Sequence, residues 1–208
     1  MSDEMEFNFV NKASGDGAPD VVINQCNQPG MNFTELIIAW TVIRNCGTGF
    51  SQGFSLPASL DISAADSRGN ETPPQTVGDG QALELVGDAS GNILRLAGTG
   101  AASPNEVEFR NNLPQGSVDA LVYKDHRLLA KQTGIAPGQK AAFSFPPQIF
   151  IGVVPGIQEG AEIPAAIMEQ AMSRIDLSGV RRADIVMTDG RRGADASPYA
   201  FHLENVET

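Results

Sequence analysis

The sequence predicts a mainly β fold, an antiparallel β-sandwich with one amphipathic helix near 164–176. Two observations lead to this prediction. Glycine occurs 22 times and proline 13 times among the 208 residues, so residues that favour turns interrupt the chain at short intervals. The segments between these turns are short, and they are either β-branched or alternate between apolar and polar side chains, as sandwich strands do. A single domain over 1–208 is expected, and two small β modules at 1–100 and 101–208 are the alternative.

Individual segments support eleven strands before the helix and two after it. Residues 106–110 alternate so that Val107 and Phe109 face inward while the charged side chains face outward. Residues 36–43 are apolar on both faces, which predicts a central strand covered on both sides. The expected strands span 6–11, 20–26, 36–44, 59–65, 82–87, 92–97, 106–110, 118–124, 127–132, 140–145, 149–154, 183–188 and 199–206.

The turn residues agree with this pattern. Residues 66–70 and 88–92 share the order Asp-x-x-Gly-Asn, in which aspartate caps the turn and glycine supplies a left-handed residue. Between the strands 118–124 and 127–132, only Asp125 and His126 are left to form the turn. A two-residue hairpin turn normally carries Asp-Gly, so His126 is expected to adopt a positive φ, which histidine tolerates better than most residues.

One helix is predicted near 164–176. Proline suits a first helical turn, and Gly179 supplies a stop. A stripe at helical spacing is expected to pack on the sheet, and a methionine-lined ligand groove is the alternative. The stripe consists of Ile167, Met168, Ala171, Met172 and Ile175.

The charge of the chain limits its partners. Fourteen Lys and Arg stand against 25 Asp and Glu, a net charge of −11. Nucleic acid and anionic bilayers would be repelled, so we expect no nucleic-acid partner, and the charge disfavours a membrane as a partner. No segment reaches the roughly 18 apolar residues of a membrane helix, and the acidic start at 1–6 does not look like a Sec-type signal peptide. The chain is therefore expected to be soluble and, by default, cytoplasmic.

Cysteine and histidine are scarce. Cys26 and Cys46 each follow an apolar strand, and antiparallel pairing of those strands would place them at opposite ends and forbid a disulfide. Free thiols are expected on that basis, whereas another arrangement would allow a bridge. With these two cysteines and two histidines, a closed zinc site is not expected, and no metal or cofactor is predicted.

No common catalytic motif is present, so the sequence favours a protein without enzymatic activity, and no catalytic residue is predicted. His202 and Glu204 share one face of a strand, which is expected to be solvated; a general base held by a carboxylate is the alternative. Four residues are interpreted as turn caps, with calcium ligation as the alternative: Asp61, Asp66, Asn70 and Glu71.

Two pairs of arginines flank the strand 183–188 and are the basic clusters of this acidic chain. They are expected to be solvated or paired within the chain, and they are the candidate contacts for a partner or an anion. These residues are Arg181, Arg182, Arg191 and Arg192.

Two stretches resemble bacterial immunoglobulin-like modules of the adhesion type. Residues 40–49 leading to Phe54-Ser55-Leu56 show a strand, an Asn-x-Gly turn and a strand, and 118–145 carry the Tyr-Lys-Asp-x-Arg-Leu-Leu hairpin followed by Ala-Pro-Gly-Gln. The resemblance covers about 40 residues. The expected sandwich is immunoglobulin-like or jelly-roll-like. The resemblance implies a binding or spacer module, and it assigns no site residue. The helix and the last two strands depart from the pattern.

Three functions are compatible with these observations. The first is a non-enzymatic β-sandwich that binds another protein or forms homo-oligomers by self-assembly. The second is a small-molecule-binding or enzymatic β protein with an apolar pocket under the helix. The third is a membrane-active β protein, which the few Trp and Tyr residues disfavour. The strand-like ends 6–11 and 199–206 are expected to pair within the chain, with exchange between copies as the alternative, and Phe7 and Phe9 should face the core.

Overall fold

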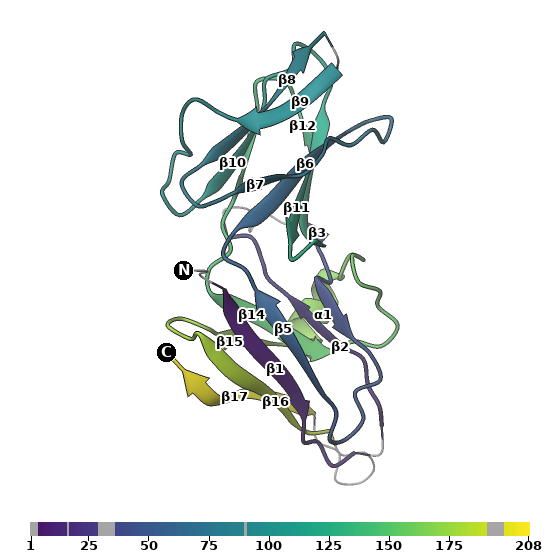
Figure 1. The fold of residues 1–208 in the computed structure, drawn as a ribbon. Coiled ribbons are helices and arrows are strands. Elements are labelled where there is room, and N and C mark those ends of the chain that lie inside the picture. Colours follow the sequence, from purple (N-terminus) through teal and green to yellow (C-terminus); the bar gives the residue numbers. More distant parts are fainter. Residues whose placement is uncertain (1–3, 16, 29–35, 90, 191–197) are drawn as a thin grey trace. The chain divides into compact units, whose positions relative to one another are not determined.

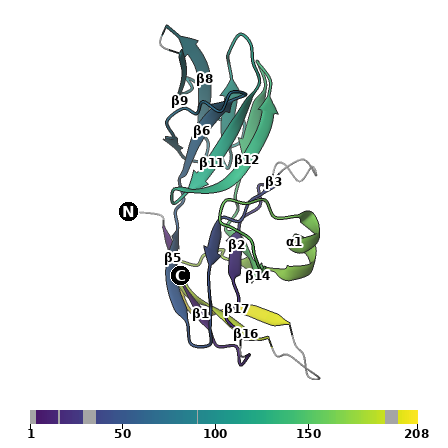
Figure 2. The ribbon, with the colours of Figure 1, turned by 90° about the vertical axis from the view of Figure 1, so that its right-hand side faces the viewer.

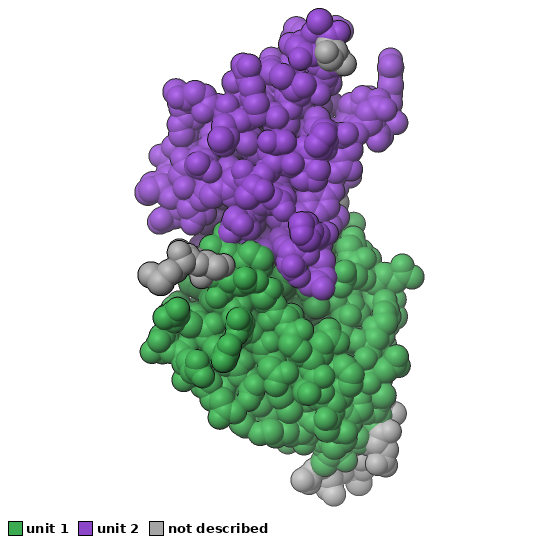
Figure 3. Space-filling model, in the orientation of Figure 1, with its two compact units in different colours: residues 1–26, 37–58, 147–208 green, residues 27–36, 59–146 purple. Residues whose placement is uncertain are grey.

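The computed structural model describes residues 4–15, 17–28, 36–89, 91–190 and 198–208. The chain divides into two compact units, shown in Figure 3. Unit 1 consists of residues 1–26, 37–58 and 147–208, and unit 2 consists of residues 27–36 and 59–146. Each unit therefore takes residues from both halves of the chain.

The described chain is mainly β, as the sequence predicts, with one helix (Figure 1). The strands are β1 (Met5–Asn11), β2 (Val21–Asn24), β3 (Leu36–Ile37), β4 (Thr41–Ile43), β5 (Ser51–Leu56), β6 (Leu60–Asp66), β7 (Gln75–Val77), β8 (Ala82–Asp88), β9 (Gly91–Leu96), β10 (Val107–Asn111), β11 (Val118–Lys124), β12 (Arg127–Ile135), β13 (Lys140–Phe143), β14 (Gln148–Val153), β15 (Met172–Asp176), β16 (Arg182–Asp189) and β17 (Tyr199–Glu207), and the helix is α1 (Ala165–Ala171).

Unit 1 contains two four-stranded sheets, in the orders β17-β16-β1-β5 and β15-β14-β2-β4. Figure 2 shows them as separate layers, with α1 on the outer side of the sheet that contains β2 and β14. β1 pairs antiparallel with β5 and parallel with β16, so the N-terminal strand is internal and pairs within its own chain. Phe7 and Phe9 are buried, as predicted. The core between the layers includes Trp40, whose ring meets Phe54 edge-on at 6.3 Å.

Unit 2 also contains two sheets. Their orders are β13-β10-β8-β9 and β3-β12-β11-β6-β7. β10 pairs with β8 in parallel, so this sandwich, like that of unit 1, contains a parallel pairing beside antiparallel ones. The buried side chains that fill it include Ile62, Leu83, Leu85, Phe109, Leu129 and Phe143.

Two turns confirm the sequence-based predictions. Asp125 and His126 have φ angles of 50° and 60° and close the hairpin in which Lys124 pairs with Arg127. Both central residues are thus left-handed, as a type I′ turn requires. In the other turn, Gly69 has a φ of 83°, and the Asp66 carboxylate accepts bonds from the backbone of Arg68 and Asn70.

The single central strand expected at 36–44 is wrong. The run is broken into β3 and β4, which both lie at sheet edges, although Ile38, Ala39 and Trp40 are buried. Backbone bonds to another segment replace the strand ladder at the break: Ala39 N donates to Ala161 O, and Ala39 O accepts from Gly160 N. Apolar character on both faces therefore reflects burial, and not a central position in a sheet.

The helix is shorter than expected. It ends at Ala171, and Met172–Asp176 forms β15 against β14. Ile167 and Met168 pack against a cluster that includes Val22, as the predicted stripe requires, whereas Ala171 is exposed and Ile175 lies on a strand. No helix in the described part of the chain is long and apolar enough to cross a membrane.

Candidate functional site

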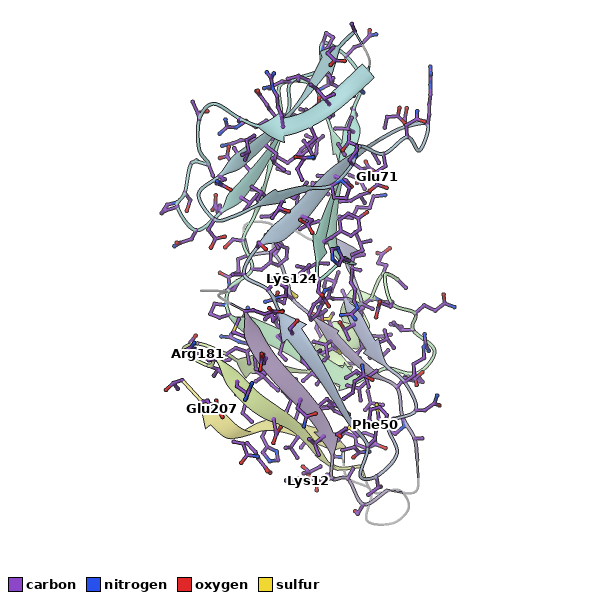
Figure 4. The ribbon with its side chains drawn as sticks, viewed as in Figure 1. Lys12, Phe50, Glu71, Lys124, Arg181 and Glu207 are labelled. Carbon is purple, nitrogen blue, oxygen red and sulfur yellow. The ribbon has the colours of Figure 1, made fainter. Side chains whose placement is uncertain are left out.

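Arg181 and Arg182 lie at the start of β16, beside the end of β17 and the start of β1. Arg182 forms an ion pair with Glu6, and Arg181 N donates to Glu207 O at 2.8 Å. Figure 4 shows Arg181 and Glu207 at the same end of the sheet. A hollow of about 410 Å³ here is lined by Glu4, Glu6, Arg181, Arg182, Glu207 and Thr208. The acids of the hollow compete with any external anion for the two guanidinium groups. Arg191 and Arg192 lie outside the described residues.

His202 and Glu204 lie on the exposed side of β17, as alternation predicts. His202 Nε2 is 3.1 Å from Glu204 Oε1, and Lys12 Nζ donates to Glu204 Oε2 at 2.6 Å. Lys12 first, and His202 second, lower the pKa of Glu204. The carboxylate thus bridges two cationic or hydrogen-bonding groups at the surface, which is the geometry of a solvated strand face.

The four residues considered for calcium bind protein groups at separate places. Asp61 accepts from Thr76 Oγ1 at 2.6 Å, and Asp66 caps its turn together with Asn70. Glu71 accepts from Ser63 and from Tyr123. Burial first, and the Glu71 hydrogen bond second, raise the pKa of Tyr123. Among the residues that the structure describes, no group of three or more His, Cys, Asp or Glu side chains is placed to hold a metal.

A buried carboxylate organises one face of unit 2. Glu108 is 1% exposed, and its carboxylate accepts from Lys140 Nζ at 2.7 Å and from Arg110 Nη2 at 2.7 Å. Burial alone would raise its pKa, but bonds from Lys140, Ala102 N and Arg110 lower the pKa to about 2. Arg110 also donates to Thr99 O and Gly100 O, so this network anchors the 97–106 loop and is a structural one.

Lys124 is the buried cation of unit 2, with 5% of it exposed. Its ammonium lies 5.9 Å from the ring centre of Phe145, and burial lowers its pKa to about 8 against the opposing charge of Asp79. Alternation along β11 gives the signal for this residue, because Val118, Ala120, Val122 and Lys124 share the inward face. Neither cysteine forms a disulfide, and burial raises the pKa of Cys46 to about 11.

The edge of unit 2 at β9 has unpaired backbone groups. Among the residues that the structure describes, β9 is the last strand of its sheet and pairs only with β8. Ala97 N donates to Ala82 O at 2.8 Å. Hydrogen-bonded and non-hydrogen-bonded residue pairs alternate along an antiparallel ladder. Because Ala97 bonds to β8, Arg95 and Ile93, which lie two and four residues earlier, also direct their backbone N–H and C=O groups toward β8. Asn92, Leu94 and Leu96 therefore direct theirs toward the open side.

This open edge also exposes apolar side chains. Leu94 and Leu96 share the inner face of β9, yet Leu96 is 56% exposed, and Ile93 on the outer face is 37% exposed. The single charged residue of the strand, Arg95, is paired with Glu84 across the ladder at 2.9 Å. β9 is thus a six-residue edge strand that exposes Ile93 and Leu96 beside the polar Asn92 and the ion-paired Arg95.

The other described edges are protected or polar. β17 is bent by an irregularity near Asn205, which has a φ of 52°, and it carries Glu204 and Glu207. β5 is open but presents Ser51, Gln52 and Gly53. β15 carries Arg174 and Asp176, and β3, β4, β7 and β13 have four residues or fewer. Bulges, charges and short strands are the devices by which proteins block edge pairing. β9 has six residues, no bulge in its pairing with β8, and one charged side chain, Arg95, which is paired with Glu84.

A hollow of about 510 Å³ lies at one end of unit 2, near the start of β9. Its lining includes Arg68, Asn92, Leu113, Gln115, Ser117 and Val118.

The sequence predicts the strand β9 but not its position at the edge of the sheet. That position depends on β8 pairing with the distant strand β10 on its other side.

No family model, curated protein or solved structure matches this chain. The resemblance to immunoglobulin-like modules therefore stays a prediction, and the function is inferred from the geometry of the chain itself.

Proposed function

We propose that this protein is a non-enzymatic β-sandwich protein that binds other polypeptides by adding their strands to the β9 edge of unit 2. The observation that carries this proposal is the combination found at β9: backbone groups facing an open edge, and Leu96 exposed on the inner face. Main-chain bonds give such edge binding its affinity, and pockets for alternate side chains give it specificity.

The energetics favour a strand whose alternate residues are apolar. Each backbone hydrogen bond formed at Leu94 and Leu96 contributes about 0.5–1.5 kcal/mol. An apolar side chain laid beside Leu96 would remove its exposed surface from water at roughly 25 cal/mol per Å². A partner strand with polar residues on its inner face would form the same hydrogen bonds but leave Leu96 uncovered. Extended segments with alternating apolar residues are therefore the preferred class of partner.

A peptide titration followed by amide NMR tests the proposal. The probe is a hexapeptide of alternating valine and threonine. We expect shifts and slowed hydrogen exchange at the amides of Leu94 and Leu96, with the amide of Ile93 unaffected because it already bonds to β8. Absence of binding at millimolar peptide would contradict the proposal.

A proline pair supplies the matched control. In Leu96→Pro the ring removes an outward N–H without breaking the ladder to β8, so peptide binding should be lost while the melting temperature changes little. Ser51→Pro makes the same change at the open edge of β5, because Asn11 N bonds to Phe50 O and so turns the backbone of Ser51 outward. That variant should bind the peptide as the wild type does.

A further inference from the structure

We infer that the strand added at β9 is β9 of a second copy of this chain, running antiparallel about a twofold axis at Leu94. The β13-β10-β8-β9 sheet of one copy would then continue into the same sheet of the second copy. This inference rests on the proposed function, because it names the partner that occupies the same edge.

The outward backbone groups of β9 are complementary to themselves. Asn92, Leu94 and Leu96 face the open side, with Leu94 at their centre. An antiparallel copy places Leu94 opposite Leu94 of the second copy and Asn92 opposite Leu96 of the second copy. Every outward donor between 92 and 96 then faces an acceptor. On the inner face, Leu94 lies opposite Leu94 of the second copy, and Leu96 lies opposite Asn92 and diagonal to Leu94 of that copy, so the added strand covers part of the exposed Leu96 side chain.

Charge selects this register from its neighbours. An axis at Arg95 would put the two Arg95 side chains directly opposite each other, and like charges in that position destabilise a sheet. With the twofold axis at Ile93, Leu96 would extend past the start of β9 in the second copy, and no residue of that strand would lie opposite it. With the axis at Leu94, Arg95 faces Ile93 of the second copy, and its aliphatic stem can lie against that apolar side chain.

The same edge is a place where two acidic molecules can approach. Each copy carries a net charge of −11, so most surfaces repel one another. The one charged residue of β9 is the cation Arg95, so this strand itself adds no negative charge to the contact. By contrast, the edge at β17 carries Glu204 and Glu207 and would meet the same charges in a second copy. Isologous pairing of this kind closes after two copies.

Sedimentation equilibrium with a charge swap at Ile93 tests the register. The register places residue 93 opposite Arg95 of the second copy. Ile93→Lys therefore puts a like charge beside that arginine, and Ile93→Glu puts an opposite charge there. Wild type should show a concentration-dependent monomer–dimer equilibrium. The dimer Kd of Ile93→Lys should exceed that of Ile93→Glu by about tenfold, since two cross-strand pairs change sign in each dimer. High salt should reduce this difference.

Matched variants at Val206 control for added charge. Val206 is 47% exposed and lies on the edge strand β17, so Val206→Lys and Val206→Glu change charge at a similar site outside the interface. Their dimer Kd values should differ by less than those of the Ile93 pair. A monomeric wild type at about 200 μM, or Ile93 variants with equal Kd values, would overturn the inference.

Disulfide cross-linking is a second test, and it can trap a dimer that forms only weakly. Under oxidation, Asn92→Cys and Leu96→Cys should form a disulfide-linked dimer when mixed, because the register sets these positions about 5.5 Å apart between Cα atoms. Neither variant alone should cross-link more than the wild type. The wild type measures the background, because it has two cysteines of its own that form no disulfide. Self-cross-linking of either variant would show another register and overturn the inference. Binding of the valine–threonine peptide by a monomeric protein would leave the proposed function standing while this inference fails.

Discussion

Lys140 Nζ lies 2.7 Å from an oxygen of Glu108, a carboxylate that is almost completely buried in unit 2. The carboxylate must therefore stay ionised for the network around the 97–106 loop to persist. Its folded-state pKa of about 2 lies below the ordinary value of 4.5. A depressed carboxyl pKa contributes stability that is present above the ordinary value and is lost as pH falls toward the folded-state value.

The first prediction concerns acid. The free energy of unfolding should fall by on the order of 2 kcal/mol between pH about 4.5 and 2 because Glu108 takes up its proton more readily in the unfolded chain. Urea melts across this range measure the change. Glu108→Gln should lose this part of the pH dependence, and Glu84→Gln, at an exposed pair, is the matched control that should keep it. Parallel acid profiles for wild type and Glu108→Gln would refute this role.

Lys124 gives a prediction at alkaline pH. Its folded-state pKa of about 8 lies below the ordinary 10.5, so the unfolded chain binds more protons between these values and stability should rise with pH. Cys46 opposes this trend above pH 9, because its pKa is raised to about 11. The measurement is therefore the difference in unfolding free energy between wild type and Lys124→Met, in which the Cys46 contribution cancels. That difference should shift in favour of wild type from pH 8 to 10; a constant difference would contradict the prediction.

His126→Gly should stabilise the protein slightly. His126 is exposed at a φ of 60°, where glycine pays no steric cost. The expected gain is a few tenths of a kcal/mol and at most about 1 kcal/mol, measured by a urea melt. His202→Gly, in the extended strand β17, should destabilise instead. A loss beyond about 1 kcal/mol for His126→Gly would show that the His126 side chain itself stabilises the fold.

The N-terminal strand should be essential to unit 1. Phe9 is fully buried in β1, between β16 and β5, so Phe9→Ala should cost about 3–5 kcal/mol of unfolding free energy. Val10→Ala, at the half-buried neighbouring position, should cost less than half as much. A chain starting at Ala13 should show a lower melting temperature for the same reason. An unchanged melt for this truncation would rule out a structural role for β1.

The sequence predicts elements well where the pattern is local. The alternation in 106–110 corresponds to β10, and the Asp125–His126 turn has the positive φ angles that its two-residue length demands. Pairing between distant segments is not encoded locally in the same way. The break at Ile38–Trp40 follows from backbone bonds to residues 160 and 161, which no pattern within 36–44 reveals.

The same distinction explains the helix and the edge. Met172 and Ile175 fit helical spacing, but pairing with β14 holds them in a strand. Residues 92–97 can be identified as a strand from their composition, whereas the open side of β9 follows only from the whole sheet order. Of the four arginines chosen from sequence, Arg181 and Arg182 line one hollow with acids from β1 and β17, which the sequence does not bring together.

Hydrogen exchange at Leu94 tests whether the edge strand β9 receives another strand. In dilute protein the amide of Leu94 should exchange quickly although its side chain is buried, while the amide of Ile93, bonded to β8, exchanges slowly. As the protein concentration rises, exchange at Leu94 should slow and approach that of Ile93. An amide of Leu94 that exchanges equally fast at every concentration, and remains fast when a strand-forming peptide is added, would contradict the account.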